Sequence, residues 1–321
     1  MSDTLAAPPA PDAAAPPAAD GPLSRDGVLA MLDRMGEDSG YFEPLGTRHW
    51  AFFVDEAPTL LVSFEQLEDI RARPDQLPLG HALAKEKGWS HLCLIADGDT
   101  WYRDPRVYGY FDRLVDDAFF EDFDHVLFMG AGVQGYAAAA FAVAAPGASV
   151  LLMAPQATQA PAIAGWDKRM PQARRLDFTS RYGYAPDMVE GAGRVFVLHD
   201  PTVPQDAMHA ALFRGRHVTH LPCRHLGGRI DWALSHMQIL APLTQAAMDA
   251  SLTRQRFAVL WRARRNFGPY LRVLLTEAQV KGRTGLEKMI CRNVTKRVNA
   301  PRFRKRLADI LAAEAEAALR D

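Results

Sequence analysis

The sequence has few cysteines and no long uninterrupted run of apolar residues. Its three cysteines, Cys93, Cys223 and Cys291, lie far apart and show no CxxC spacing, which favours a reducing compartment over a disulfide-stabilised secreted protein. The chain does not begin with a basic segment followed by an apolar one, and no run approaches the ~18 apolar residues that a membrane-spanning helix needs. We therefore expect a cytoplasmic protein without a membrane span.

The chain also carries almost no net charge. It has 37 basic and 38 acidic residues, for a formal net charge of -1, so the overall charge selects no class of partner. Of its 321 residues, 48% are hydrophobic and 23% are charged, a composition typical of a globular protein with a sizeable core. These values favour one large domain with appendages.

Shifts in composition divide the chain into three parts. Residues 1–22 are almost entirely Ala, Pro, Asp and Gly, which predicts a disordered tail. Residues 23–228 alternate between strand-like and helix-like segments, with a long insertion at 155–192 that is rich in Pro, Arg, Gly and aromatics. Residues 229–321 have only helical patterns. We expect a domain over 23–228 and a helical C-terminal region over 229–321.

Short apolar runs bounded by turn residues predict the strands. Several of these runs are apolar on both faces, as expected for parallel strands covered on two sides. Helix-length segments separate them, which indicates an α/β fold with a doubly wound, mostly parallel sheet. The predicted strands cover residues 50–54, 59–64, 89–96, 125–129, 149–153, 194–198 and 217–221.

A turn of small residues connects the strand at 125–129 to the following helix. The segment Gly130-Ala131-Gly132-Val133-Gln134-Gly135 resembles the nucleophile elbow of α/β-hydrolases, in which a strained turn projects a Ser hydroxyl above the sheet. Gly132 occupies the Ser position, and Gln134 stands where a small residue is usual. Because glycine has no side chain to attack a carbonyl, this turn cannot carry out covalent acyl transfer.

The resemblance extends to the order of the other two catalytic positions. Asp200 follows the strand at 194–198, and His225 follows the strand at 217–221, so nucleophile, acid and base positions occur in the family's order. The resemblance covers residues 50–230. It implies an α/β-hydrolase fold close to a degenerate, esterase-like bacterial group, in which Asp200 and His225 remain as acid and base.

Several functions are compatible with an elbow that lacks its nucleophile. The backbone N–H groups of Val133 and Gln134 would face a ligand oxygen at a helix N-terminus. The protein would then be a pseudoenzyme that binds a small or glycan-like ligand, or a partner. Alternatively, it is a hydrolase or acyltransferase with a non-standard nucleophile, with His225 as general base. The turn is equally compatible with an inherited fold corner that binds nothing.

Two further residues are candidates for contact with a ligand. Trp101 follows the strand at 89–96, where we expect aromatics at the rim of the sheet, and Arg169 lies in the 155–192 insertion, which follows a strand end. An aromatic and a cation at these places suit a sugar-like or anionic ligand. The competing interpretations are a polar turn at residues 97–100 and solvated loop charges paired with nearby Asp residues.

The sequence gives little support for a metal or cofactor, and we expect none. His217, His220, Cys223 and His225 include zinc-ligand types, but an extended strand separates residues 217 and 225 too widely to share one ion. Similar bacterial proteins are often named phosphoadenosine phosphosulfate reductases. Those enzymes use a Gly/Ser-rich phosphate loop and a C-terminal Cys nucleophile, whereas residues 130–135 contain no Ser or Asp and Cys291 lies in a helical stretch.

The region from Arg254 to Arg306 is strongly basic, because it contains sixteen Lys and Arg residues and only two acidic residues, Glu277 and Glu287. It predicts an interaction module for an acidic partner. No finger spacing or interleaved stacking aromatics accompany the charges, which argues against nucleic acid. Residues 112–124 are acidic and would receive the basic region within the fold or in a homo-oligomer, which is the interpretation we favour.

Overall fold

The computed structural model describes residues 23–319. The Ala/Pro-rich segment 1–22, predicted to be disordered, lies outside these residues. The body of the chain is built on one eight-stranded sheet in the order β1-β2-β4-β3-β5-β6-β7-β8. The strands are β1 (Gly40–Pro44), β2 (His49–Val54), β3 (Thr59–Gln66), β4 (Ser90–Ala96), β5 (His125–Ala131), β6 (Ser149–Met153), β7 (Arg194–His199) and β8 (Val218–Pro222).

The sheet is mostly parallel, as predicted. β2 pairs antiparallel with both β1 and β4, and every pair from β4 through β8 is parallel. β2 and β4 are buried along their whole length, because helices cover both faces. β1 was not predicted: it is a half-exposed edge strand that contains Gly, Glu and Pro, residues that are depleted in strands.

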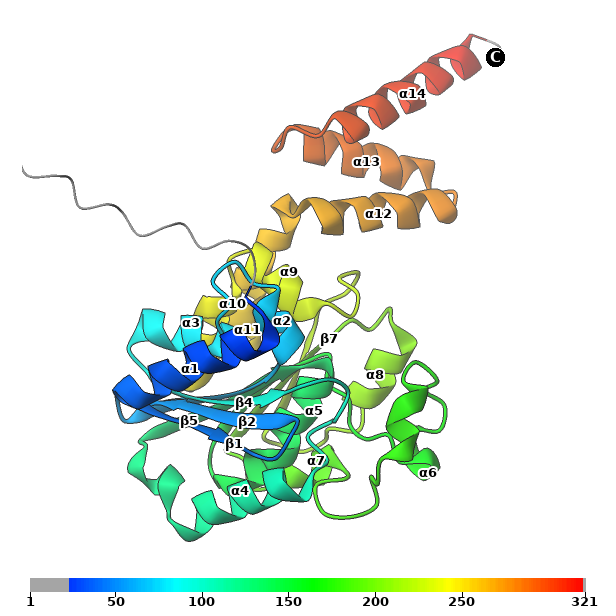
Figure 1. Cartoon of the computed structure of the whole chain (residues 1–321). Helices are drawn as coiled ribbons and strands as arrows, with labels where there is room; N and C mark the ends of the chain where they lie inside the picture. The colour runs from blue at the N-terminus through cyan, green and yellow to red at the C-terminus, as the bar shows by residue number, and fades with distance from the viewer. Residues whose placement is uncertain (1–22, 320–321) are drawn as a thin grey trace, which may run out of the picture.

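Helices lie on both faces of the sheet (Figure 1). One face carries α1 (Arg25–Ser39), α2 (Leu67–Arg71), α3 (Leu79–Lys87), α9 (Ile230–His236), α10 (Leu240–Met248) and α11 (Arg254–Leu260), and the other carries α4 (Pro105–Asp116), α5 (Gly132–Phe141) and α7 (Ala185–Met188). The short helices α6 (Pro161–Ala164) and α8 (Pro204–Ala210) complete the body. The architecture is of the α/β-hydrolase type.

Local signals fix where several helices begin. The Ser24 hydroxyl accepts the N–H of Gly27 at the start of α1, and the Asp104 carboxylate accepts the N–H of Arg106 at the start of α4. Both are N-cap contacts, and Pro105 at the first position of α4 needs no hydrogen-bond partner for its nitrogen. Such caps place α4 immediately after the loop that follows β4.

The helices beyond Gly228 form two groups. α9, α10 and α11 pack on the sheet and share its core through Leu234, Leu243 and Phe257. α12 (Gly268–Val280), α13 (Thr284–Thr295) and α14 (Pro301–Ala318) project away from the body (Figure 1). These last three helices, which we call the arm, enclose a separate core of Leu271, Leu275, Cys291, Val294 and Phe303. No helix within residues 23–319 is long and apolar enough to cross a membrane.

Buried histidines make the stability of the fold depend on pH. His49 is 1% exposed, its Nε2 lies 2.7 Å from the Thr100 hydroxyl, and burial lowers the pKa of His49 to about 4. Below pH ~6.5 the imidazole of His49 binds a proton in the unfolded chain but stays neutral in the folded chain. The free energy of unfolding therefore falls by about 1.4 kcal/mol per pH unit, through this residue, as the pH drops toward 4.

The slope of the free energy of unfolding against pH reports the number of protons taken up on unfolding. We expect His49→Gln to lower that number by close to one, in urea unfolding curves measured between pH 7 and pH 4. The glutamine amide can keep the bond to Thr100 but takes up no proton. His125→Gln, at an exposed position, is the control and should leave the slope unchanged. An unchanged slope in His49→Gln would contradict this account.

Candidate functional site at the elbow

The turn between β5 and α5 has the geometry of a nucleophile elbow. Ala131 ends β5 in an extended conformation and caps α5, and Gly132 follows with a φ of 57°, in the left-handed region that side-chain-bearing residues seldom adopt. A Cβ built on Gly132 would meet no atom within 4 Å. The position that carries Ser in the hydrolases therefore points into open space.

Two other glycines allow the strand and the helix to approach closely. A Cβ on Gly130 would lie 2.2 Å from the carbonyl oxygen of Gln134, and a Cβ on Gly135 would lie 3.2 Å from both the Gly130 carbonyl and Pro155. The idea that Gln134 occupies the position requiring a small residue is therefore corrected. Gly135, one residue later, provides that close approach, and Gln134 borders the open side of the turn.

A cavity of about 630 Å³ lies over this turn. Its floor is Ala131, Gly132, Val133 and Gln134, and the insertion contributes Met170. Ligands in open α/β sheets bind outside the carboxyl ends of the strands, which is where this cavity lies. The other polar or aromatic residues that line it are Asp69, Arg73, Arg229, Asp231, Trp232, Ser235 and His236.

The wall of the cavity formed by α9 was not predicted from the sequence. Trp232 is 40% exposed, and its ring lies 4.2 Å from that of His236, centroid to centroid. The His236 Nδ1 donates to the Trp232 carbonyl at 2.8 Å, which leaves Nε2 as the free ring nitrogen. Trp232 and His236 are four residues apart, as are Asp231 and Ser235, and this spacing on a helix could have signalled a shared face.

Asp200 follows β7, at the position predicted for a catalytic acid, but its carboxylate accepts hydrogen bonds from two backbone N–H groups and one hydroxyl. It is 1% exposed, and its carboxylate accepts the Thr202 N–H at 2.8 Å, the Thr202 hydroxyl at 2.6 Å and the Gly227 N–H at 2.8 Å. Burial opposes ionisation, but these bonds outweigh it and hold the pKa of Asp200 below its usual value. Asp200 therefore ties the loop after β7 to the loop after β8.

His225 is not positioned by Asp200 as a catalytic base would be. Within residues 23–319, its imidazole makes no hydrogen bond to the Asp200 carboxylate, and neither residue borders the elbow cavity. His225 has a φ of 66°, in the left-handed region that side-chain-bearing residues seldom adopt. The structure thus keeps the order of the two residues along the chain without joining their side chains.

The two predicted ligand contacts outside the elbow also have other partners. Trp101 is 1% exposed and packs edge-on against Tyr136 and Phe178, so its placement at the rim was wrong. The loop after β4 turns inward at this residue, where φ is 56°. Arg169 binds Asp167 at 2.7 Å and Asp206 at 2.6 Å, which fastens the insertion to α8.

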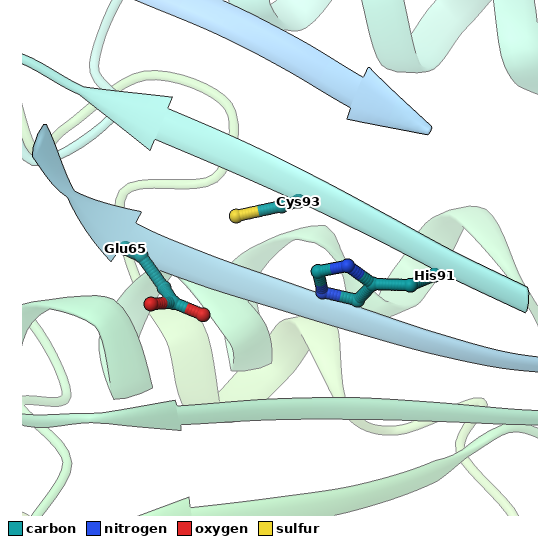
Figure 2. A group of neighbouring side chains, drawn as sticks. All are labelled: Glu65, His91 and Cys93. Carbon is teal, nitrogen blue, oxygen red and sulfur yellow. The ribbon is translucent and has the colours of Figure 1, made fainter. Parts of the chain in front are cut away.

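A buried polar cluster beside the elbow has the donor types of a metal centre. Glu65, His91 and Cys93 come from the neighbouring strands β3 and β4 (Figure 2), and their donor atoms lie within 4.8 Å of one another. Thiolate, imidazole and carboxylate together suit Zn²⁺. This is a different set from the one considered at residues 217–225.

Hydrogen bonds already occupy the Glu65 carboxylate and the Nε2 of His91, whereas the buried Nδ1 of His91 has no hydrogen-bond partner in the described chain. The two Glu65 oxygens accept the N–H groups of Leu79 and Gly80, each at 2.8 Å, and the Ser63 hydroxyl lies 2.9 Å from the His91 Nε2. Burial raises the pKa of Cys93 and lowers that of His91, so both are neutral, whereas a metal needs a thiolate. The cluster could hold Zn²⁺ only by exchanging these hydrogen bonds for metal bonds.

The chain matches no protein-family model and no curated protein sequence. Among solved structures, a hyperthermophilic esterase from Pyrobaculum calidifontis has a TM-score of 0.39 and 15% identity, with 74% of this chain and 91% of that chain covered. An S-formylglutathione hydrolase from Agrobacterium tumefaciens has a TM-score of 0.40 and 15% identity, with coverages of 56% and 82%. The Glycosylation Associate Protein (Gap123) complex from Streptococcus agalactiae has a TM-score of 0.43 and 13% identity, with coverages of 63% and 45%.

The environments of Gly130 and Gly132 predict different costs for one added methyl group. Gly130→Ala places a carbon against the Gln134 carbonyl, and we expect it to cost at least about 3 kcal/mol, the upper end for overpacking. Gly132→Ala meets open space, so it should cost only the ~1–2 kcal/mol of a left-handed alanine. Chemical unfolding monitored by circular dichroism compares the two. A Gly132→Ala variant as unstable as Gly130→Ala would contradict this elbow geometry.

Proposed function

We propose that this protein is a catalytically degenerate α/β-hydrolase-fold protein that binds a glycan-like ligand in the elbow cavity. The observation that carries this proposal is the cavity of about 630 Å³ over Gly132, bordered by the half-exposed ring of Trp232. The volume is within the roughly 300–1,000 Å³ of sites that take small molecules. The open elbow gives the ligand a rigid floor.

The loss of catalysis follows from two features of the elbow. Gly132 supplies no nucleophile, and the Asp200 carboxylate holds Thr202 and Gly227 in place of the His225 ring. A hydrolase needs a nucleophile, a base within hydrogen-bond reach of it and a group that orients the base. What remains at the turn is the first N–H groups of α5, which favour a ligand oxygen over a cation.

The chemistry of the cavity wall suits a sugar. The Trp232 ring gives a flat apolar surface for the C–H face of a pyranose, while the carboxylates of Asp69 and Asp231 accept hydroxyl protons. Arg73 and Arg229 border the same cavity and can donate to hydroxyls or to an acidic group on the sugar. An aromatic surface flanked by donors and acceptors in this way gives both affinity and orientation.

A hydrolase or acyltransferase with a substitute nucleophile is the second candidate function. Ser235 and His236 border the cavity, and the free Nε2 of His236 could accept a proton. These two side chains make no hydrogen bond to each other in the described part of the chain, so the Ser235 hydroxyl lacks an activating base.

For catalysis, we expect no turnover of 4-nitrophenyl acetate beyond the weak acceleration, at most ~10³-fold over water, that an elbow without its nucleophile can give. His225→Ala and Ser235→Ala should leave this rate unchanged. Release of 4-nitrophenolate measures it. Robust wild-type turnover that is abolished by either substitution would contradict the proposed loss of catalysis.

For binding, we expect Trp232→Ala to weaken the binding of oligosaccharides at least about tenfold, because the stacking surface is removed. Calorimetric titration with neutral gluco-oligosaccharides and with uronic-acid oligosaccharides measures the affinity and separates the two sugar classes. Trp232→Phe should retain part of the affinity. Trp166→Ala, in the insertion and outside the residues that line the cavity, is the control, and equal losses in both alanine variants would contradict the assignment.

A further inference from the structure

The basic charge of the C-terminal helices is largely unpaired within the chain. Three ion pairs involve the basic residues of 254–306: Lys281 with Glu277, Lys288 with Glu314 and Arg306 with Glu287. The remaining Lys and Arg residues of this region form no ion pair with residues 23–319. Most of these unpaired cations lie on the arm, which therefore carries a concentrated positive charge.

Most carboxylates of the acidic segment 112–124 also form no ion pair in the described chain, and the segment lies away from the arm. Asp112 pairs with Arg181, whereas Asp116, Asp117, Glu121, Asp122 and Asp124 form no ion pair in the described chain. α4 covers one face of the sheet, and the arm projects beyond the helices of the other face (Figure 1). The two charged regions therefore do not pair within one chain in this structure.

A cavity of about 660 Å³ adjoins the acidic segment. It lies at the amino ends of β5, β6 and β7, the opposite edge of the sheet from the elbow, and its lining includes His125, Ser149 and Arg194. Glu121 and Asp124 border it together with the apolar side chains of Leu114, Val115, Phe120, Phe123 and Met248. Val115 is 51% exposed. The Arg194 guanidinium donates to the Ala250 carbonyl at 2.5 Å and so turns toward the body.

The outward face of α13 has the complementary pattern. Leu286 is 41% exposed and Met289 is 69% exposed. Arg292 follows Met289 by three residues and Lys296, the C-cap of α13, follows it by seven, spacings that place both cations on the Met289 side of the helix. An apolar stripe flanked by cations is the pattern of a helix that docks into an apolar groove with an acidic rim. Neither the stripe nor the cavity is covered within the described chain.

We propose that α13 of one chain docks into the acid-rimmed cavity of a second copy, with Leu286 and Met289 against Val115 and its neighbours, and Arg292 and Lys296 facing Glu121 and Asp124. Two different surfaces of the same protein meet in this contact. It is therefore heterologous and joins copies head to tail, into a ring or an open chain. Opposite charges steer the approach and make the association sensitive to salt.

Light scattering after size exclusion tests this proposal with the full chain. At low ionic strength the wild-type mass should rise with concentration, and high salt should reverse the rise. Arg292→Glu with Lys296→Glu, or Glu121→Lys with Asp124→Lys, should each weaken the association at least about tenfold. Combining all four substitutions in one chain should restore it. Arg34→Glu with Lys85→Glu, two exposed positions on α1 and α3, is the control and should match the wild type.

Cross-linking gives a second readout that needs no charge reversal. The three native cysteines are buried, so Val115→Cys and Met289→Cys chains, mixed and mildly oxidised, should form a disulfide-linked pair. A Val115→Cys and Val259→Cys mixture should not, although Val259 is 55% exposed. A monomeric wild type at all concentrations, equal cross-linking in both mixtures, or a four-fold variant that folds but stays monomeric would overturn the proposal. Loss of polyanion binding with self-association unchanged would assign the arm to nucleic acid instead.

Discussion

The close contact between β5 and α5 is the constraint on which the candidate site depends. The Cα of Gly130 lies so near the Gln134 carbonyl that no side chain fits between them, and this contact sets the angle at which α5 leaves the sheet. Gly132 has a left-handed conformation at the same turn, and the first residues of α5 border the cavity. The elbow therefore presents a glycine, which has no reactive group, on packing that Gly130 and Gly135 make possible.

Asp200 is a buried carboxylate with a structural role in the loops at the carboxyl ends of β7 and β8. A buried carboxylate requires hydrogen-bond partners, and here Thr202 and Gly227 supply them. Because Gly227 follows His225 by two residues, Asp200 still determines the course of the loop that carries this histidine. The acid position therefore has a structural role that does not depend on catalysis.

The sequence predicted the sheet well because its strands are apolar runs with clear boundaries. The runs at 125–129 and 149–153 correspond to β5 and β6, and the elbow lies at the predicted residues. β1 was missed because Gly40, Glu43 and Pro44 are weak strand formers, and β1 is an edge strand that pairs only with β2 among the described strands. The C-terminal helices were expected from their periodicity, but their division into body and arm depends on tertiary packing.

The candidate site was harder to predict than the fold. Trp101 has the local surroundings of a rim residue, yet the contacts with Tyr136 and Phe178 that bury it come from segments distant in sequence. Conversely, nothing in the local sequence says that α9 crosses above Gly132 and brings Trp232 and His236 to the cavity. Residues on neighbouring strand ends can be placed from strand order, whereas a helix that returns over the sheet requires the path of the whole chain.

The helices α12–α14 have a hydrophobic core of their own, separate from the cores that cover the sheet. Leu271, Leu275, Cys291, Val294 and Phe303 contact one another rather than the core beneath the sheet, and the short helix over Trp261–Asn266 joins the two parts. A small core of this kind confers modest stability, so the arm can open and close while the sheet stays intact. Amide hydrogens of the arm would then exchange with solvent ahead of those in β3 to β7, and the arm can diverge in sequence without endangering the body.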